Sequence, residues 1–258
     1  MSMSPGPSIS RQASPWLAAC AFAAALGAGP ALAQDGWQFA LSPYVWLPGV
    51  STAVDTGQGT VDVDTSASDA ISDLDMALMA AFEARKGKWG LLVDLIYSDL
   101  ASRASTPLGV LWDKAKVDTR MTALSVYAGY RVIEHDKGWL DVLAGGRFYW
   151  LDVDLRLTPG AARGRSFDLD GDWADPLIGL RGRYDFTDRW FATAIGDAGG
   201  FGGGSDESWQ AIGVLGYQFD ERWSIEAGWR YMSVEKELGG RDVAVDLSGP
   251  LIGVTARF

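Results

Sequence analysis

The chain has 258 residues, a formal net charge of −11, 48% hydrophobic and 21% charged residues, which suits one large domain. Its 32 Gly and 12 Trp are spread through the sequence; this excludes a disordered chain, which would lack the tryptophans, and suits strands whose backbones approach closely. The acidic balance makes nucleic acid and anionic lipid surfaces poor partners.

Residues 1–33 have the pattern of a secretory signal peptide. Arg11 supplies a positive charge, Leu17–Leu26 is an alanine-rich apolar core, and Ala31-Leu32-Ala33 is a cleavage site of the A-x-A type. An uncleaved membrane helix and a lipoprotein signal at Cys20 are the alternatives. The sequence therefore predicts an exported domain, residues 34–258, without cysteine and without internal disulfides.

Ten segments carry apolar or small residues at every second position, which is the period of a β-strand. In chain order they are Trp37–Leu47, Leu74–Arg85, Trp89–Tyr97, Leu124–Arg131, Leu140–Trp150, Asp175–Phe186, Trp190–Phe201, Trp209–Phe219, Trp223–Tyr231 and Val243–Phe258. The first long connection, Val50–Ser72, adds a short strand at Val61–Thr65 after a turn at Gln58-Gly59.

The hairpin Trp209–Tyr231 shows the pattern most clearly, with a polar turn at Asp220-Glu221-Arg222. One face of each strand is aromatic at its ends and small or aliphatic between them, and the other face carries charge. In a soluble sheet the apolar face would pack on a second layer. In a membrane barrel the apolar face contacts lipid and the charged face lines the lumen.

The connections favour the membrane barrel over a soluble sandwich. Four short turns end in tryptophan, whereas the other connections are longer and acidic, among them Ser102–Lys114 and Asp152–Asp172. The turn tryptophans Trp89, Trp139 and Trp223 lie 8 to 11 residues from the next outward aromatic, and a tilted spanning strand needs about 9 to 11. We therefore predict an all-β, transmembrane antiparallel up-and-down barrel of about ten strands, with eight or twelve as alternatives, short periplasmic turns and long outer loops.

The last segment ends in Gly253, Ala256 and Phe258, a pattern that resembles the C-terminal signal of Gram-negative outer-membrane barrels. Leu251 departs from it, because the signal usually has a polar residue there. The resemblance implies recognition by the barrel-assembly machinery.

Two further motifs, Pro43–Gly49 and Phe82–Gly90, resemble an uncharacterised family of small proteobacterial outer-membrane proteins. That resemblance implies a location in the bacterial outer membrane, among its lipid and lipopolysaccharide, and implies no activity. The sequence indicates neither a ligand nor an oligomeric state.

Residues that could carry chemistry are few. His135, the one histidine, falls in a predicted periplasmic turn, whereas serine or aspartate hydrolysis with histidine needs an imidazole beside the nucleophile or water. No phosphate loop, dinucleotide fingerprint or zinc spacing is present, so we expect no cofactor and no enzymatic activity. A hydrolase that uses paired loop carboxylates is a less favoured alternative.

The best metal candidate is the acidic run Asp168, Asp170 and Asp172. Three carboxylates at alternate positions could bind Ca²⁺, but an EF-hand loop would have glycine and glutamate where this chain has Trp173 and Gly179. Loose binding of divalent ions beside lipopolysaccharide is the alternative.

The charged faces of the strands predict a network in the lumen. Its members are Glu83, Arg85, Asp94, Arg131, Asp141, Arg147, Asp175, Arg181, Arg183, Asp185, Asp197, Glu226, Arg230 and Arg257. Buried charges persist only when paired, so these groups either fill a narrow interior or line a slender polar passage. Arg147 and Arg181 are expected to be central, with Asp141, Asp175 or Glu226 as partners.

We therefore expect a non-enzymatic outer-membrane barrel with a structural or surface-interaction role, whose loops contact lipopolysaccharide or another partner. A narrow channel for small polar solutes is the alternative.

Overall fold

The computed structural model describes residues 36–55, 60–65, 74–104, 112–159, 165–202, 204–237 and 242–258. The predicted signal peptide and the Gln58-Gly59 turn lie outside these ranges. Within them no helix is long and apolar enough to cross a membrane.

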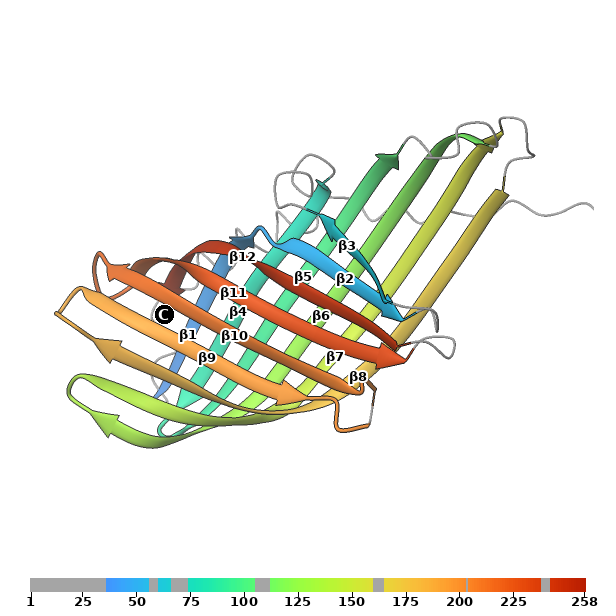
Figure 1. The fold of residues 1–258 in the computed structure, drawn as a ribbon. Coiled ribbons are helices and arrows are strands. Elements are labelled where there is room, and N and C mark those ends of the chain that lie inside the picture. The colour runs from blue at the N-terminus through green and yellow to red at the C-terminus, as the bar shows by residue number, and fades with distance from the viewer. Residues whose placement is uncertain are drawn as a thin grey trace, which may run out of the picture.

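The chain folds as a closed barrel of ten antiparallel strands (Figure 1). These are β1 (Trp37–Trp46), β4 (Leu74–Lys86), β5 (Trp89–Ala104), β6 (Trp112–His135), β7 (Gly138–Pro159), β8 (Arg165–Asp185), β9 (Trp190–Gly199), β10 (Glu207–Gln218), β11 (Trp223–Glu237) and β12 (Asp242–Arg257). Each strand pairs with the next, and β1 closes the barrel by pairing with β12. The prediction of a ten-stranded antiparallel barrel is confirmed.

A hairpin extends one side of the barrel. β2 (Gly49–Asp55) continues along β12 in the register that β1 begins, and β3 (Thr60–Thr65) pairs with β2. The predicted strand at Val61–Thr65 is confirmed, whereas Val50–Asp55, predicted as loop, is a strand.

β5, β6, β7 and β8 run well beyond their predicted ends and project beyond the rest of the barrel (Figure 1). β7 and β8 remain paired out to Leu157 and Arg165, so the predicted Asp152–Asp172 loop is wrong. In the predicted Ser102–Lys114 loop the two ends are strand, because β5 runs to Ala104 and β6 begins at Trp112; residues 105–111 lie outside the described ranges. Backbone hydrogen bonds to neighbouring strands sustain these segments although their side chains have become polar.

Both ends of the barrel chain lie with the short turns. The turns after β4, β6, β8 and β10 lie at one end, where Phe258 pairs with Phe39 through two backbone hydrogen bonds. We call this the short-turn end, and the opposite one the long-strand end.

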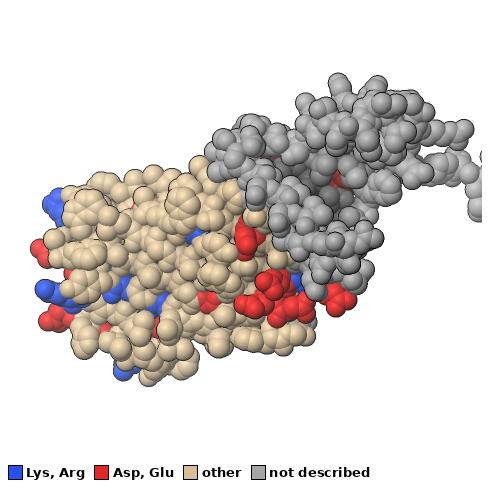
Figure 2. Space-filling view, viewed as in Figure 1, with Lys and Arg blue, Asp and Glu red and all other residues tan. Residues whose placement is uncertain are grey.

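The outward face of the barrel is apolar. Trp89, Ile178, Leu180 and Trp229 are each more than half exposed, and the wall between the two charged ends is largely uncharged in Figure 2. At the long-strand end acidic side chains gather (Figure 2). An apolar outer band with aromatic residues is the surface that lipid requires of a barrel.

Candidate functional site in the lumen

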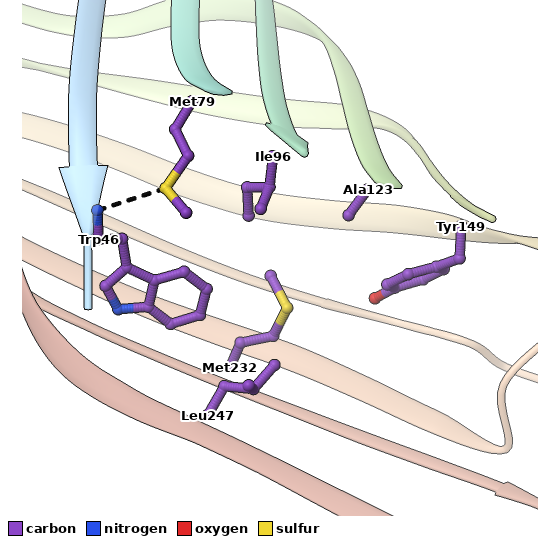
Figure 3. Packing of buried hydrophobic residues seen from close by; sticks show 7 residues of the cluster. All are labelled: Trp46, Met79, Ile96, Ala123, Tyr149, Met232 and Leu247. Atoms are coloured by element: carbon purple, nitrogen blue, oxygen red, sulfur yellow. Dashed lines mark hydrogen bonds between the residues drawn. The ribbon is translucent and has the colours of Figure 1, made fainter. Parts of the chain in front are cut away.

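An apolar plug fills the lumen towards the long-strand end. Its buried members are Trp46, Met79, Ile96, Ala123, Tyr149, Met232 and Leu247. They come from seven different strands and point towards one another (Figure 3). The backbone N–H of Trp46 donates to the sulfur of Met79 at 3.3 Å, and Met232 has no exposed surface.

A polar layer follows on the short-turn side of the plug, centred on Arg147 of β7. Its Nη2 donates to Asp197 at 2.9 Å and to the Tyr127 hydroxyl at 3.0 Å, and its Nε donates to Ser125 at 2.9 Å. Gln210 donates to Asp197 and to Tyr127 as well. Each residue comes from the inward side of its strand, as the alternation places it.

Arg230 of β11 completes this layer on the other side of the lumen. Its guanidinium donates to Asp94 at 2.9 Å, to the Tyr44 hydroxyl at 3.0 Å and to the side-chain oxygen of Gln210 at 2.6 Å. It also lies 4.9 Å from the ring centre of Trp46. Gln210 therefore connects the hydrogen-bond networks of Arg147 and Arg230. Because Arg230 contacts Trp46, the polar layer packs directly on the plug.

A second cluster of charges surrounds Trp139 near the short-turn end. The guanidinium groups of Arg131, Arg181 and Arg85 lie 4.4, 5.0 and 5.8 Å from its ring centre. Cations over an indole ring are attracted by its quadrupole. The indole ring thus attracts three guanidinium groups that would otherwise repel one another.

Two carboxylates balance those arginines. Asp141 accepts from Arg131 at 3.0 Å and also from Arg85. Glu83 accepts from Arg85 at 3.1 Å and from Arg181 at 2.8 Å. Shared carboxylates of this kind keep buried arginines compensated.

The opposite side of the short-turn half is more loosely paired. Arg183 bonds Asp185 at 2.8 Å and lies 3.6 Å from the ring centre of Phe191. Glu226 accepts from the hydroxyls of Ser224 and Thr255. Nη1 of Arg257 is buried and has no hydrogen-bond partner among the residues that the structure describes.

These side chains surround a cavity of about 700 Å³, which we call the vestibule. Its lining runs from Trp37, Arg222 and Phe258 at the short-turn end to Tyr127 and Arg230 in the polar layer. The expected narrow interior that paired charges fill, one of the two alternatives, is therefore wrong for this half of the lumen. The reason is that its inward residues include small and aliphatic side chains as well as arginines.

The structure brings most of the predicted charge network together, with partners that differ from those expected. Arg147 pairs with Asp197 and Arg181 pairs with Glu83, so the expected partners Asp141, Asp175 and Glu226 are wrong for both arginines. Asp175 instead accepts the backbone N–H of Ser205 at 2.7 Å, from the connection between β9 and β10. Strands tilt and stagger in a barrel, so inward neighbours cannot be found from positions along the sequence.

Trp139 and the plug were missed. The sequence pattern suggested that Trp139 belongs to the outward aromatic girdle, as Trp89 does, but it lies in the lumen with the arginines. Its position in the strand could have indicated this. Trp139 lies an even number of residues from Asp141 and Arg147, whose side chains face inward, so the alternation places all three on the same face. The alternation also places Trp46 and Met79 on the inward face, but nothing in their chemistry indicates that they form a plug.

The other predicted candidates lie apart from this site. Asp168, Asp170 and Asp172 fall within β8, where Asp170 and Asp172 are exposed and the Asp168 side chain lies outside the described residues. Across the part of the chain that the structure describes, no three His, Cys, Asp or Glu side chains are grouped to hold a metal ion. His135 is exposed and ends β6 at the short-turn end.

No protein-family model matches the chain, and no curated protein matches it by sequence. Among solved structures it resembles the outer-membrane protease OmpT from Escherichia coli, with a TM-score of 0.58, 10% identity, and coverage of 87% of this chain and 98% of OmpT. The fold is that of a Gram-negative outer-membrane β-barrel. The translocator domain of the autotransporter NalP from Neisseria meningitidis also matches, with a TM-score of 0.41, 16% identity, and coverage of 94% and 97%.

Proposed function

We propose that this chain is a non-enzymatic outer-membrane protein whose lumen is closed to solutes and which acts as a structural or surface-interacting element of the envelope. The observation that carries the proposal is the pair of layers across the lumen. Met232 and Arg147 have no exposed surface in the plug and the polar layer, and packed interiors of this kind leave no path for water.

The outward face supports residence in the outer membrane. Trp89 packs on Tyr130 at 4.9 Å and Trp209 stacks on Tyr231 at 4.7 Å between ring centres, at opposite ends of the apolar wall. Aromatic girdles at both membrane interfaces are typical of outer-membrane barrels.

Planar-bilayer recording tests the closed lumen. We expect the refolded parent to give no unitary current steps. The triple variant Trp46→Ala, Met232→Ala, Arg230→Ala should conduct, because it removes two large side chains from the plug and one from the polar layer. The matched control Trp229→Ala alters an outward tryptophan that is 53% exposed and should remain silent.

Unitary steps in the parent would instead favour the second candidate, a narrow channel for small polar solutes. The vestibule supports this candidate, because it already supplies a charged passage from the short-turn end to the polar layer. A channel would then need a rearrangement of both the polar layer and the plug.

An acidic belt at the long-strand end supports the surface role. Asp152 pairs across strands with Asp170, and Glu207 pairs with Glu235; all four side chains are exposed. Like charges directly opposite one another destabilise a sheet. Divalent cations that bridge the belt to lipopolysaccharide phosphates would relieve this repulsion.

Thermal unfolding in lipopolysaccharide-containing liposomes tests the belt. Millimolar Mg²⁺ should raise the melting temperature of the parent more than that of the variant Asp152→Asn, Glu207→Asn. Asp188→Asn, in a short turn at the other end, should behave as the parent. An equal Mg²⁺ effect on both variants would contradict a role for the belt.

The non-enzymatic assignment is supported by the position of His135, which lies at the short-turn end, away from the acidic belt. The protease activity in OmpT's name is a property of that protein. We expect no cleavage of a quenched fluorescent protein substrate by whole cells that display the barrel; cleavage abolished by Asp152→Asn would contradict the assignment.

A further inference from the structure

We propose that the vestibule is a binding site for a small amphipathic anion, a carboxylate or sulfonate attached to an apolar body, which enters from the short-turn end. This goes beyond the structural role, since it needs neither conduction nor the acidic belt. It rests on an excess of arginines in the lining, an apolar wall and the size of the cavity.

The anionic group would bind at Arg257 and Arg181. Both line the vestibule, whose lining carries seven arginines and four Asp or Glu residues. An excess of guanidinium groups around one cavity favours a ligand with negative charge. An anion provides acceptors that a guanidinium binds in a fixed planar geometry.

The protein's own carboxylates do not fully meet this need. Glu83 already accepts from Arg85 as well as Arg181. Arg183 and Arg181 repel Arg257 electrostatically, whereas Glu226 and Glu83 attract it. The Glu226 carboxylate is already engaged by two hydroxyls. The Phe258 main-chain oxygen lies at the same rim, where it accepts the N–H of Phe39.

The apolar body would lie against aliphatic side chains on the neighbouring wall. Leu92, Ile195, Ile212 and Val214 all line the vestibule, although the lumen of a barrel is ordinarily polar. Leu92 and Ile195 pack on the buried cluster of Tyr127, Leu143 and Leu177, which fixes this wall in place. Apolar surface that water would otherwise cover favours a ligand with an apolar part.

The dimensions of the vestibule agree with such a ligand. Its volume of about 700 Å³ falls within the range of about 300 to 1,000 Å³ found for small-molecule pockets. Its inner end is bounded by Arg230 and Tyr127, whose polar groups are engaged with Asp94 and Asp197. The ligand would therefore be held in a blind site and would leave by the end through which it entered.

The test uses the full-length barrel in phosphatidylcholine nanodiscs and ¹⁹F NMR titration with 4-(trifluoromethyl)benzenesulfonate. Empty nanodiscs report partition into lipid, and 4-(trifluoromethyl)benzyl alcohol is the neutral probe. We expect saturable binding of the sulfonate. Arg257→Gln should weaken it by about tenfold, which corresponds to the loss of one charge-assisted hydrogen bond.

The matched control is Arg189→Gln, an exposed arginine of the same barrel end that bonds the outward Tyr217 and should leave binding unchanged. Ile212→Asp should also weaken binding, because it puts a negative charge in the apolar wall. If Arg257→Gln does not fold, Arg181→Gln replaces it, since Glu83 would keep Arg85 as partner.

No saturable binding by the parent would overturn the proposal. So would equal affinity for the sulfonate and the alcohol, or equal losses in Arg257→Gln and Arg189→Gln. A barrel that binds the sulfonate and gives no current supports both proposals. A barrel that binds the sulfonate and conducts contradicts the proposal of a closed lumen and leaves the binding site supported.

Discussion

Arg147 and Asp197 form an ion pair of 2.9 Å in which neither side chain is exposed to solvent. They belong to β7 and β9, and Gly179 of the intervening β8 lies so close to Asp197 that a Cβ on it would come within 2.8 Å of the Asp197 Cβ. The absence of a side chain at Gly179 therefore gives Asp197 its place. The pair links β7 and β9 across β8 at mid-lumen.

Arg147→Ala should destabilise the barrel by about 3 to 5 kcal/mol, because it leaves Asp197 as an uncompensated buried charge. Urea unfolding in lipid vesicles, followed by heat-modifiable gel mobility, measures the loss. The double variant Arg147→Met, Asp197→Leu should lose less, since both charges are removed together. Arg189→Ala should resemble the parent, and a single variant as stable as the parent would show that the pair contributes nothing.

Trp139→Leu should destabilise the barrel by about 2 kcal/mol, since three arginines lose their indole contact and each such contact contributes about 0.5 to 2 kcal/mol. Trp89→Leu is the control, because that tryptophan is 64% exposed on the outer wall. The urea concentrations at the unfolding midpoints of the two variants measure this difference in stability. Equal shifts would mean that Trp139 acts only as a girdle residue.

The barrel itself could be predicted because each strand carries its signal locally. In Trp223–Tyr231, for example, alternation places Trp229 outside and Arg230 inside, and the structure has them 53% and 1% exposed. Strand ends were harder to predict. The segments around Asp152 and Asp170 have the composition of a loop, yet these two residues pair across β7 and β8. The reason is that a long hairpin can continue beyond the lipid with polar side chains.

The contents of the lumen could be predicted only in part. The alternation of side chains along each strand places Arg147 and Arg230 in the lumen. Their partners depend on strand tilt and stagger, which no local pattern encodes. Trp46, Met79 and Met232 form the plug from β1, β4 and β11, positions that are distant in the sequence and unremarkable one by one. The vestibule exists because small inward residues such as Ala40, Ala81 and Thr193 leave space between the arginines.

Epitope tags should establish the orientation in the membrane. A tag between β7 and β8, at residues 160–164, should be reached by antibody on intact cells, because the strands on either side of it form the longest projection of the barrel. A tag at Asp220-Glu221, in the short turn before β11, should be reached only after the outer membrane is permeabilised. The reverse pattern of labelling would invert the topology.

Deletion of Phe258 should leave unassembled, protease-sensitive chain in cells. Phe258 exchanges two backbone hydrogen bonds with Phe39, of 2.9 and 3.0 Å, and their rings stack at 5.9 Å. It thus closes the seam between β1 and β12, and it is also the terminal residue of the expected assembly signal. Phe186→Ala, which removes a 54% exposed aromatic at the same barrel end, should assemble normally.

Refolding the Phe258 deletion in detergent separates its two roles. If the seam matters most, the purified chain should fold with reduced heat-modifiable yield in vitro as well as in cells. If recognition by the barrel-assembly machinery matters most, the yield should fall only in cells. Normal assembly in cells would contradict both roles, and the seam would then be held by the remaining β1 and β12 pairs, from Ala40 with Arg257 to Trp46 with Leu251.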